Sequence, residues 1–290
     1  MSLELSFSNW RAYMQLTRLD KPIGIYLLLW PTIWALVIAA DGLPSLGITL
    51  IFIAGVVLMR SAGCVINDYA DRKVDGSVKR TNARPLVSGT VTEREALQLF
   101  ALLVGLSFIL VLMLNWQTIA LSVVALFLAA SYPFMKRYTH MPQAVLGAAF
   151  GWAIPMAFAA IQGSVPLEGW LLFIANLTWT IAYDTYYAMV DRDDDLRIGM
   201  RTSAITLGRF DVIGIALFYA LCIGCWWWVG QDAGRGVVYQ VGLLVAAAQA
   251  VWHVGLIRHR QREDCFRAFR ANHWLGMTVW VGTVLDFALA

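Results

Sequence analysis

The chain has 290 residues, of which 59% are hydrophobic and only 14% are charged. A soluble globular domain carries about 25% charged residues, so this composition, with a mean hydropathy of +0.64, excludes an ordinary soluble protein. The formal net charge of +3 gives no indication of nucleic-acid binding. We therefore expect a polytopic, all-α membrane protein whose residues 1–290 form a single domain.

Nine apolar runs, each near the length of about twenty residues that spans a bilayer, recur along the chain. We expect each run to form one transmembrane helix of a single bundle. Tryptophans near the predicted ends, among them Trp34 and Trp226, are expected in an aromatic belt at the membrane–water interface. The predicted spans are residues 22–40, 46–66, 96–114, 117–134, 142–161, 168–190, 211–229, 237–257 and 272–289.

Lysine and arginine gather in alternate connections between these runs. If the N-terminus lies in the cytoplasm, all of them except Arg60 and Arg235 fall on the cytoplasmic side. Cytoplasmic segments of membrane proteins carry an excess of basic residues, so this pattern predicts the orientation. It also predicts cytoplasmic cap loops at about 67–95, 135–141 and 191–210.

Two acidic motifs lie at the ends of the second and the sixth apolar runs. The first is NDYADRKVD at residues 67–75, and the second is DTYYAMVDRDDD at residues 184–195. A carboxylate at the centre of a membrane helix costs roughly 2.5 to 3.5 kcal/mol on insertion scales, so two such clusters indicate a bound cation. Both predicted helices run from the outside inward, and the motifs should therefore emerge together at the cytoplasmic end.

Helical spacing aims each motif at one face, because successive residues are about 100° apart. Mg²⁺ keeps several waters and binds through one or two carboxylates together with substrate phosphates. Two aspartate faces among apolar helices thus favour Mg²⁺ that carries a diphosphate with a long lipid tail. Hydrated helix ends are the alternative, but they do not explain the matched spacing. The residues expected on the two faces are Asp68, Asp71 and Asp75 on one helix, and Asp184, Tyr187, Asp191 and Asp195 on the other.

The motifs NDxxDxxxD and DxxYAxxDxxxD resemble the paired signatures of the UbiA superfamily of intramembrane aromatic prenyltransferases. Further segments resemble the branch that acts on 4-hydroxybenzoate, and the resemblance covers essentially the whole chain. It implies a helical bundle around a central cavity that opens toward the membrane. The implied reaction is Mg²⁺-dependent transfer of a polyprenyl group from polyprenyl diphosphate to the ring carbon ortho to the hydroxyl of 4-hydroxybenzoate, in ubiquinone biosynthesis. The further segments are DKPIG at 20–24, ARPL at 83–86, YPFMKRY at 132–138 and GAAFGW at 147–152.

The resemblance also implies roles for individual residues. The aspartates Asp68, Asp71, Asp75, Asp184, Asp191 and Asp195 would hold Mg²⁺ and diphosphate, assisted by Asn67. Tyr132 and Lys136, expected on one helical face, would lie near the reacting centre, the lysine on the diphosphate and the tyrosine beside the carbocation. Asp71, Asp75, Asp191 and Asp195 would act with them in catalysis.

Four basic residues and one tyrosine complete the expected substrate site. Arg60, inside a membrane helix, would meet either the substrate carboxylate or a motif carboxylate. Arg137 would either bind the benzoate carboxylate or serve only as a basic residue of the cytoplasmic side. Arg72 and Lys79 are expected on the diphosphate, and Tyr187 in the substrate pocket. The cap loops would exclude water while the carbocation exists.

Other functions remain open at this stage. Transfer to protoheme, homogentisate or a chlorophyll precursor would keep the same mechanism. A divalent-cation transporter would place carboxylates near the middle of the membrane, whereas here they lie at one face among lysines and arginines. A membrane scaffold would leave the aspartates unexplained. The absence of a transit peptide and the resemblance predict a bacterial inner-membrane location, with the active site facing the cytoplasm.

Overall fold

The computed structural model describes residues 4–77 and 81–289, and every regular element in these ranges is a helix. The all-α prediction is therefore confirmed. The α-helices are α1 Trp10–Leu16, α2 Ile23–Ala39, α3 Leu46–Asp71, α4 Glu93–Val111, α5 Trp116–Ser131, α6 Pro142–Gly151, α7 Ala153–Gln162, α8 Leu167–Ile198, α9 Ser203–Leu207, α10 Asp211–Asp232, α11 Val237–Ile257 and α12 Arg262–Leu289. The short 3₁₀ helices are η1 Phe7–Asn9, η2 Asp75–Ser77, η3 Tyr132–Arg137 and η4 Gly208–Phe210.

Six helical segments in the described part of the chain are long and apolar enough to cross a membrane. The shorter apolar helix α2 and the long helices α8 and α12 are not among them, although each overlaps one of the nine predicted spans. The chain is thus a multi-pass membrane protein by length and composition. The six segments are Leu46–Asp71, Glu93–Val111, Trp116–Arg137, Pro142–Gln162, Ser203–Asp232 and Val237–Ile257.

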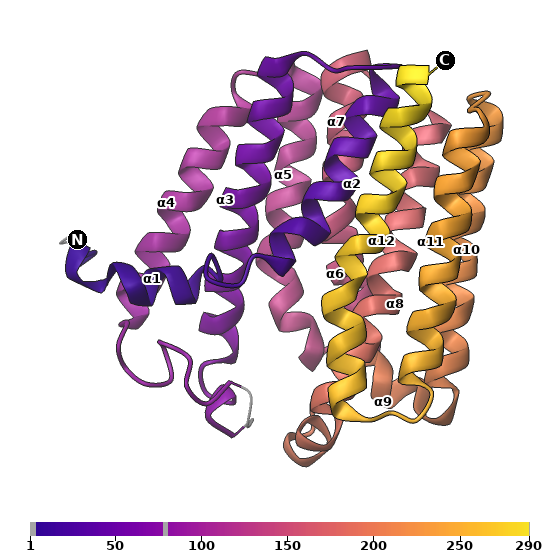
Figure 1. Ribbon diagram of the computed structural model, residues 1–290. Coiled ribbons are helices and arrows are strands. Elements are labelled where there is room, and N and C mark those ends of the chain that lie inside the picture. The colour runs from indigo at the N-terminus through magenta and orange to yellow at the C-terminus, as the bar shows by residue number, and fades with distance from the viewer. Residues whose placement is uncertain (1–3, 78–80, 290) are drawn as a thin grey trace.

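The long helices stand side by side in one bundle, and α1 lies across the flank of α3 and α4 (Figure 1). Helices α3 and α4 form one side, whereas α8, α10, α11 and α12 pack together on the other. The C-terminal end of α3 and the C-terminal end of α8 both lie at the lower end of the bundle in Figure 1. The chain path therefore brings the two acidic motifs to the same end, as predicted.

Three tryptophans form the centre of the core between α2, α8 and α10. Trp34, Trp179 and Trp226 are fully buried. Their ring centroids lie 5.8 Å apart for Trp34 and Trp179, 5.1 Å for Trp34 and Trp226, and 6.1 Å for Trp179 and Trp226. Aromatic pairs of this kind contribute about 0.5–1.5 kcal/mol each beyond area burial. The expectation that Trp34 and Trp226 belong to an interfacial belt is wrong, because both pack inward on Trp179.

A buried hydrogen-bond network fixes α8 against its neighbours. The side-chain oxygen of Asn272 on α12 accepts from Trp179 Nε1 at 2.5 Å, and its amide nitrogen donates to the hydroxyls of Tyr186 and Tyr219. The two hydroxyls are 2.9 Å apart, and His253 Nδ1 on α11 lies 3.4 Å from the Tyr219 hydroxyl. The network links α8, α10, α11 and α12, and so holds in place the helix that carries the second motif.

Helices α6 and α8 approach closely because α6 presents Gly147 and Gly151 to α8. A Cβ at Gly147 would lie 2.9 Å from the carbonyl oxygen of Leu177, and a Cβ at Gly151 would lie 2.9 Å from Asn176 Nδ2. Small residues four apart allow such close packing of membrane helices. Close packing against α8 therefore accounts for the two glycines of the GAAFGW segment.

Three predicted boundaries need correction. Helix α3 ends at Asp71 rather than continuing through the first motif, because the chain turns there and the amide of Val74 donates to the Asp71 carbonyl oxygen at 2.8 Å. Helix α8 continues to Ile198, where Gly199 ends it with φ of 70°, so the 191–210 segment is largely helical. Residues 132–137 form a 3₁₀ helix, not an α-helix.

We expect Gly147→Leu to lower the free energy of unfolding by about 1–3 kcal/mol, because the added side chain meets the backbone of Leu177. The measurement is thermal unfolding in detergent. The control is Gly224→Leu, since a Cβ at Gly224 meets no atom within 4 Å. Equal melting temperatures for the two variants would contradict the close packing of α6 on α8.

Candidate active site

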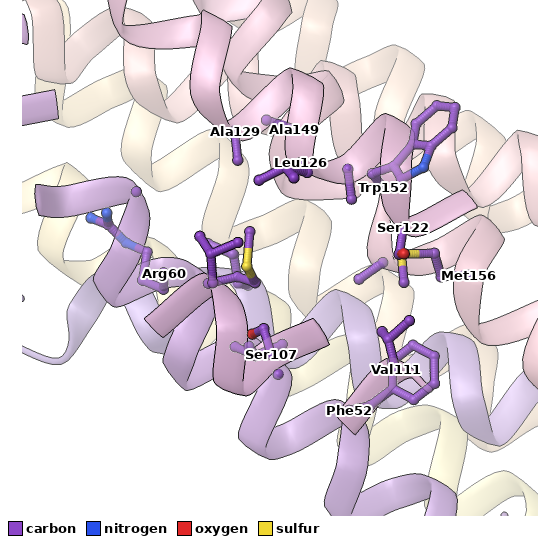
Figure 2. Close-up of a pocket in the computed structure, with 18 of the residues that line it drawn as sticks. Phe52, Arg60, Ser107, Val111, Ser122, Leu126, Ala129, Ala149, Trp152 and Met156 are labelled. Atoms are coloured by element: carbon purple, nitrogen blue, oxygen red, sulfur yellow. The ribbon is translucent and has the colours of Figure 1, made fainter. Parts of the chain in front are cut away.

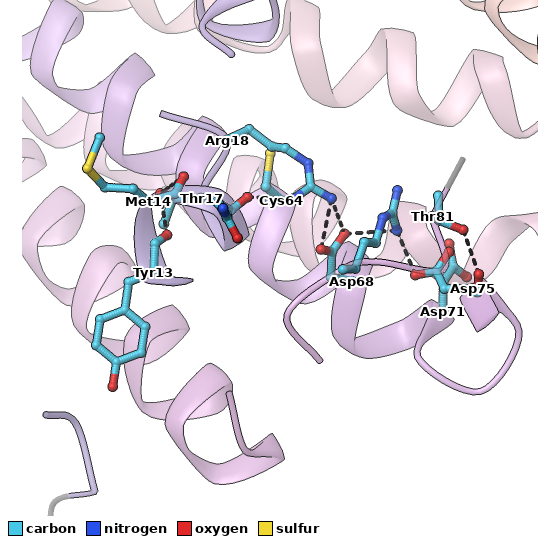
Figure 3. Close-up of polar contacts among 12 residues, drawn as sticks. Tyr13, Met14, Thr17, Arg18, Cys64, Asp68, Asp71, Asp75 and Thr81 are labelled. Atoms are coloured by element: carbon cyan, nitrogen blue, oxygen red, sulfur yellow. Dashed lines mark hydrogen bonds and ion pairs between the residues drawn. The ribbon is translucent and has the colours of Figure 1, made fainter. Parts of the chain in front are cut away.

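The last turn of α3 carries two buried carboxylates. Asp68 and Asp71 are 1% and 3% exposed. Both oxygens of Asp68 accept hydrogen bonds from Nη2 of Arg18, at 2.9 and 2.8 Å (Figure 3). Arg84 Nη1 lies 2.9 Å from the same carboxylate. Because a buried carboxylate is stable only when it is paired, Asp68 draws together the turn after α1 and the loop before α4.

Asp75 joins this cluster from outside the helix. Its carboxylate lies 2.6 Å from Arg84 Nη1, and Thr81 Oγ1 donates to its backbone carbonyl oxygen at 2.8 Å (Figure 3). Burial raises the pKa of Asp75, and the nearby Arg84 guanidinium opposes that increase. The expectation that Asp75 shares a helical face with Asp68 is wrong, but Arg84 brings the two carboxylates together by bridging them.

The 3₁₀ helix η3 lies against the end of α3. Lys136 Nζ is 3.1 Å from Asp71 Oδ2, Arg137 donates to the carbonyl oxygen of Ala70 at 2.7 Å, and the Tyr132 hydroxyl donates to Gly63 O at 3.3 Å. The helical i, i+4 reasoning for Tyr132 and Lys136 was wrong, since this turn is not α-helical. Both residues nevertheless reach α3 close to the first motif.

The second motif lies along one continuous helix, which confirms its predicted local structure. Asp191 is buried, and Arg262 at the start of α12 lies 3.7 Å from it and 3.0 Å from Asp194. The Arg262 guanidinium also donates to the carbonyl oxygen of Val190. Tyr187 stacks on Phe269 with ring centroids 4.1 Å apart. Asp184 and Asp195 are half-buried on α8.

Helix η3 connects the surroundings of the two motifs. Its Lys136 contacts Asp71, and the Lys136 carbonyl oxygen accepts from the amide of Arg201, just after α8, at 3.3 Å. Arg201 also donates to the carbonyl oxygen of Tyr138 at 3.2 Å. The polar ends of α3 and α8 are therefore joined through η3.

The carboxylate set fits a hard cation such as Mg²⁺. In the part of the chain that the structure describes, no three His, Cys, Asp or Glu side chains converge closely enough to form a closed metal site. Asp71 Oδ1, however, is buried and receives no hydrogen bond from any described residue. All-oxygen donors with an available buried anionic oxygen suit a cation that completes its shell with water and phosphate oxygens.

Arg60 lies deeper in the bundle, at one end of an apolar cavity of about 230 Å³ (Figure 2). Its guanidinium donates to Cys64 Sγ at 2.7 Å and lies 5.6 Å from the ring centroid of Phe150. No carboxylate among the described residues pairs with it, and its Nε has no partner there. A Cβ at Gly24 would lie 2.3 Å from Arg60 Nε, so the DKPIG glycine leaves room for this guanidinium.

The structure brings most of the predicted site residues to one end of the bundle. Arg72 turns aside, 2.8 Å from Glu93 and with its guanidinium carbon 4.1 Å from the centre of the Tyr69 ring. Asn67 is half-buried on the last turn of α3, and Lys79 lies outside the described residues.

Sequence reasoning missed Arg18 and Arg84 as partners of the first motif. From the sequence, Arg18 is expected only among the basic residues of the cytoplasmic side. Arg84 is expected as part of the ARPL segment and as a basic residue of the 67–95 cap loop, where ordinary surface charge is the favoured role. Arg18 has a left-handed backbone with φ of 59°, a conformation that is uncommon for a residue other than glycine. That conformation was not visible in the sequence, whereas the ARPL resemblance was a signal for Arg84.

Comparison with known proteins finds relatives that align with nearly the whole chain. Two relatives, from Pseudomonas syringae pv. tomato (strain ATCC BAA-871 / DC3000) and Azoarcus sp. (strain BH72), are 59% and 60% identical over 277 residues. Each alignment covers 96% of this chain, with 94% and 96% of the respective relative, and both proteins are named 4-hydroxybenzoate octaprenyltransferase.

Solved structures share the fold. A UbiA homolog from Aeropyrum pernix K1 superposes with a TM-score of 0.80 at 25% identity, over 91% of this chain and 97% of that one. A UbiA homolog from Archaeoglobus fulgidus, bound to GPP and Mg²⁺, superposes with a TM-score of 0.71 at 17% identity, over 94% and 99% of the two chains. Residues 28–276 match the UbiA prenyltransferase family. With two acidic motifs at one end of a helical membrane bundle and relatives of this similarity, the chain belongs to the UbiA prenyltransferase family.

Proposed function

We propose that this protein transfers a polyprenyl group from polyprenyl diphosphate to the ring carbon ortho to the hydroxyl of 4-hydroxybenzoate, with Mg²⁺ as cofactor, in ubiquinone biosynthesis. The observation that carries the proposal is the order in which charged and apolar surroundings follow one another along α3. Buried carboxylates end the helix, Arg60 lies deeper, and an apolar cavity begins at Arg60. These environments suit a metal-bound diphosphate, an aromatic acid and a lipid tail respectively.

At the diphosphate end, the six aspartates of the two motifs would hold Mg²⁺, and Asn67 would assist. Bound Mg²⁺ would neutralise charge on the departing diphosphate. Lys136, now paired with Asp71, and Arg84, now paired with Asp68 and Asp75, supply cationic donors beside the same carboxylates. We propose that these cations, together with Arg72 and Lys79 of the cap loop, also contact diphosphate oxygens.

At the acceptor end, Arg60 would bind the carboxylate of 4-hydroxybenzoate. An arginine inside a membrane bundle is costly without an anionic partner, and a guanidinium matches the two oxygens of a carboxylate. The described residues provide no carboxylate for Arg60, which favours the substrate over a motif aspartate as its partner. We place Arg137 outside this contact, since it is engaged with the Ala70 carbonyl oxygen.

The apolar cavity would receive the tail and keep water away from the reacting carbon. The allylic C–O bond breaks with its electron pair passing to the diphosphate oxygen. A ring electron pair of the phenol then forms the new C–C bond, and the ring proton leaves to a base. Tyr132, which lines the cavity beside Gly63, would lie near the cation-like carbon, and Tyr187 would line the acceptor pocket. Exclusion of water prevents capture of that carbon.

We also propose that the bundle crosses a bacterial inner membrane nine times, with the N-terminus and the active site on the cytoplasmic side. The distribution of lysine and arginine supports this orientation. The single domain would span residues 1–290, with polar cap segments between α3 and α4, at η3, and after α8.

Asp191→Asn should lower prenyl transfer at least a hundredfold, because it removes a buried anionic oxygen from the proposed metal site. The measurement uses membranes, 4-hydroxybenzoate and labelled polyprenyl diphosphate, with Mg²⁺ or with a chelator. Asp193→Asn is the matched control, since Asp193 is exposed on the same helix. Product formation by wild type that is insensitive to chelator, or full activity of Asp191→Asn, would refute the metal–diphosphate site. Product only with a different acceptor would refute the 4-hydroxybenzoate assignment.

Arg60→Met should lower kcat/KM for 4-hydroxybenzoate at least a hundredfold while the KM for prenyl diphosphate changes little. The methionine keeps much of the side-chain volume but cannot pair with a carboxylate. Steady-state kinetics with each substrate varied in turn separates the two effects. Arg270→Met serves as control at an exposed position of α12. An equal loss for both substrates would assign Arg60 to the structure of the site rather than to the acceptor.

A further inference from the structure

The cavity that begins at Arg60 is elongated along α3. Its lining runs on this helix from Gly63 to Ile51. Helix α4 contributes from Val104 to Val111, the turn after it contributes Leu114, and α5 contributes from Ser122 to Ala129. At 1.5 Å per residue, the stretch from Gly63 to Ile51 is about 18 Å long. Figure 2 shows Arg60 at one end, with Phe52 and Val111 toward the other.

A long prenyl tail does not fit inside this length. An extended chain of single bonds advances about 1.2 Å per bond, as an extended polypeptide does. On that basis the main chain of a geranyl tail reaches about 8 Å, and that of an octaprenyl tail about 37 Å, from its first carbon. An octaprenyl tail must therefore pass along the cavity and leave it, whereas a geranyl tail ends inside it.

On its α4 and α5 side, the cavity is lined by apolar residues that are also exposed at the outer surface of the bundle. Phe108, Val123 and Leu126 all line it, and they are 48%, 63% and 39% exposed. In a bilayer this edge faces lipid, so a tail that leaves here remains in an apolar environment. The tail must first pass the middle of the cavity on α3.

Gly55 occupies that middle position. It lines the cavity, and a Cβ built on it would meet no atom within 4 Å, so the space beside it is cavity rather than neighbouring protein. With the first carbon of the tail beside Tyr132 and Gly63, as the proposed function requires, Gly55 lies about 12 Å further along the helix. That distance is beyond the end of a geranyl tail and well short of the end of an octaprenyl tail. Ser107, buried on α4, also lines the cavity.

We propose that the missing side chain at Gly55 sets the length of prenyl tail that this protein accepts. The inference rests on the proposed prenyl-transfer function and adds a residue that determines its donor specificity. A glycine within a helix lowers helix stability relative to alanine. Passage of a long tail is a function that requires this open position, because any larger side chain would occupy the path.

The test compares wild type and Gly55→Leu with geranyl diphosphate and octaprenyl diphosphate as alternative donors. We expect kcat/KM for the octaprenyl donor to fall at least tenfold, and kcat/KM for the geranyl donor to change less than threefold. Gly55→Val, with a smaller side chain, should shift the same ratio less. Gly105→Leu is the matched control, because Gly105 is exposed on α4, does not line the cavity and also has open space around its Cβ.

The outcomes separate this inference from the function on which it rests. If wild type transfers neither tail, the proposed function fails. If wild type is active and Gly55→Leu loses both donors equally, or keeps the wild-type ratio, Gly55 does not select tail length. If Gly105→Leu shifts the ratio as strongly as Gly55→Leu, the effect does not arise in the cavity. Unfolding temperatures of both variants in detergent, matched to wild type, accompany the kinetics.

Discussion

Charge compensation at the end of α3 is the constraint on which the rest of the site depends. Asp68, Asp71 and Asp75 are buried, and a buried carboxylate without a partner is costly. Their partners Arg18, Arg84 and Lys136 come from the turn after α1, the loop before α4, and η3. Removing one member of a buried pair costs about 3–5 kcal/mol. The acidic motif therefore organises three separate segments around itself.

The second motif is supported in a different way. It lies on the continuous helix α8. Asn272 and the tryptophan core fix the apolar part of this helix, and Arg262 pairs with its polar end. The carboxylates of the second motif thus lie on one regular helix. Those of the first motif are brought together by the loop before α4, through the ion pairs of Arg84. Sites built on regular elements hold their geometry more tightly than sites on loops.

Between the polar end and the apolar cavity, Arg60 marks the change of environment. Its neighbours are Cys64, Phe150 and the backbone of Gly24, and no described carboxylate neutralises it. Charge, aromatic surface and apolar volume therefore follow one another along α3 within a few turns. This order accommodates three chemical groups: the diphosphate of the donor, the aromatic acid of the acceptor, and the lipid tail of the donor.

Hydropathy alone determined the helical class and the multi-pass character, and the count of apolar runs placed the two motifs at one end. The helical period determined the single face of the second motif, because that face follows from local spacing. Tertiary structure alone decided three other features. These are the turn that brings Asp75 back to Asp68, the pairing of Arg18 with Asp68, and the inward packing of Trp34 and Trp226. Arg18 and Asp68 are 50 residues apart, and whether a tryptophan faces lipid or a neighbouring helix depends on which helix packs beside it. The apolar pattern of the sequence is the same for a tryptophan that faces lipid and for one that faces a neighbouring helix. Only the contacts between helices distinguish the two placements.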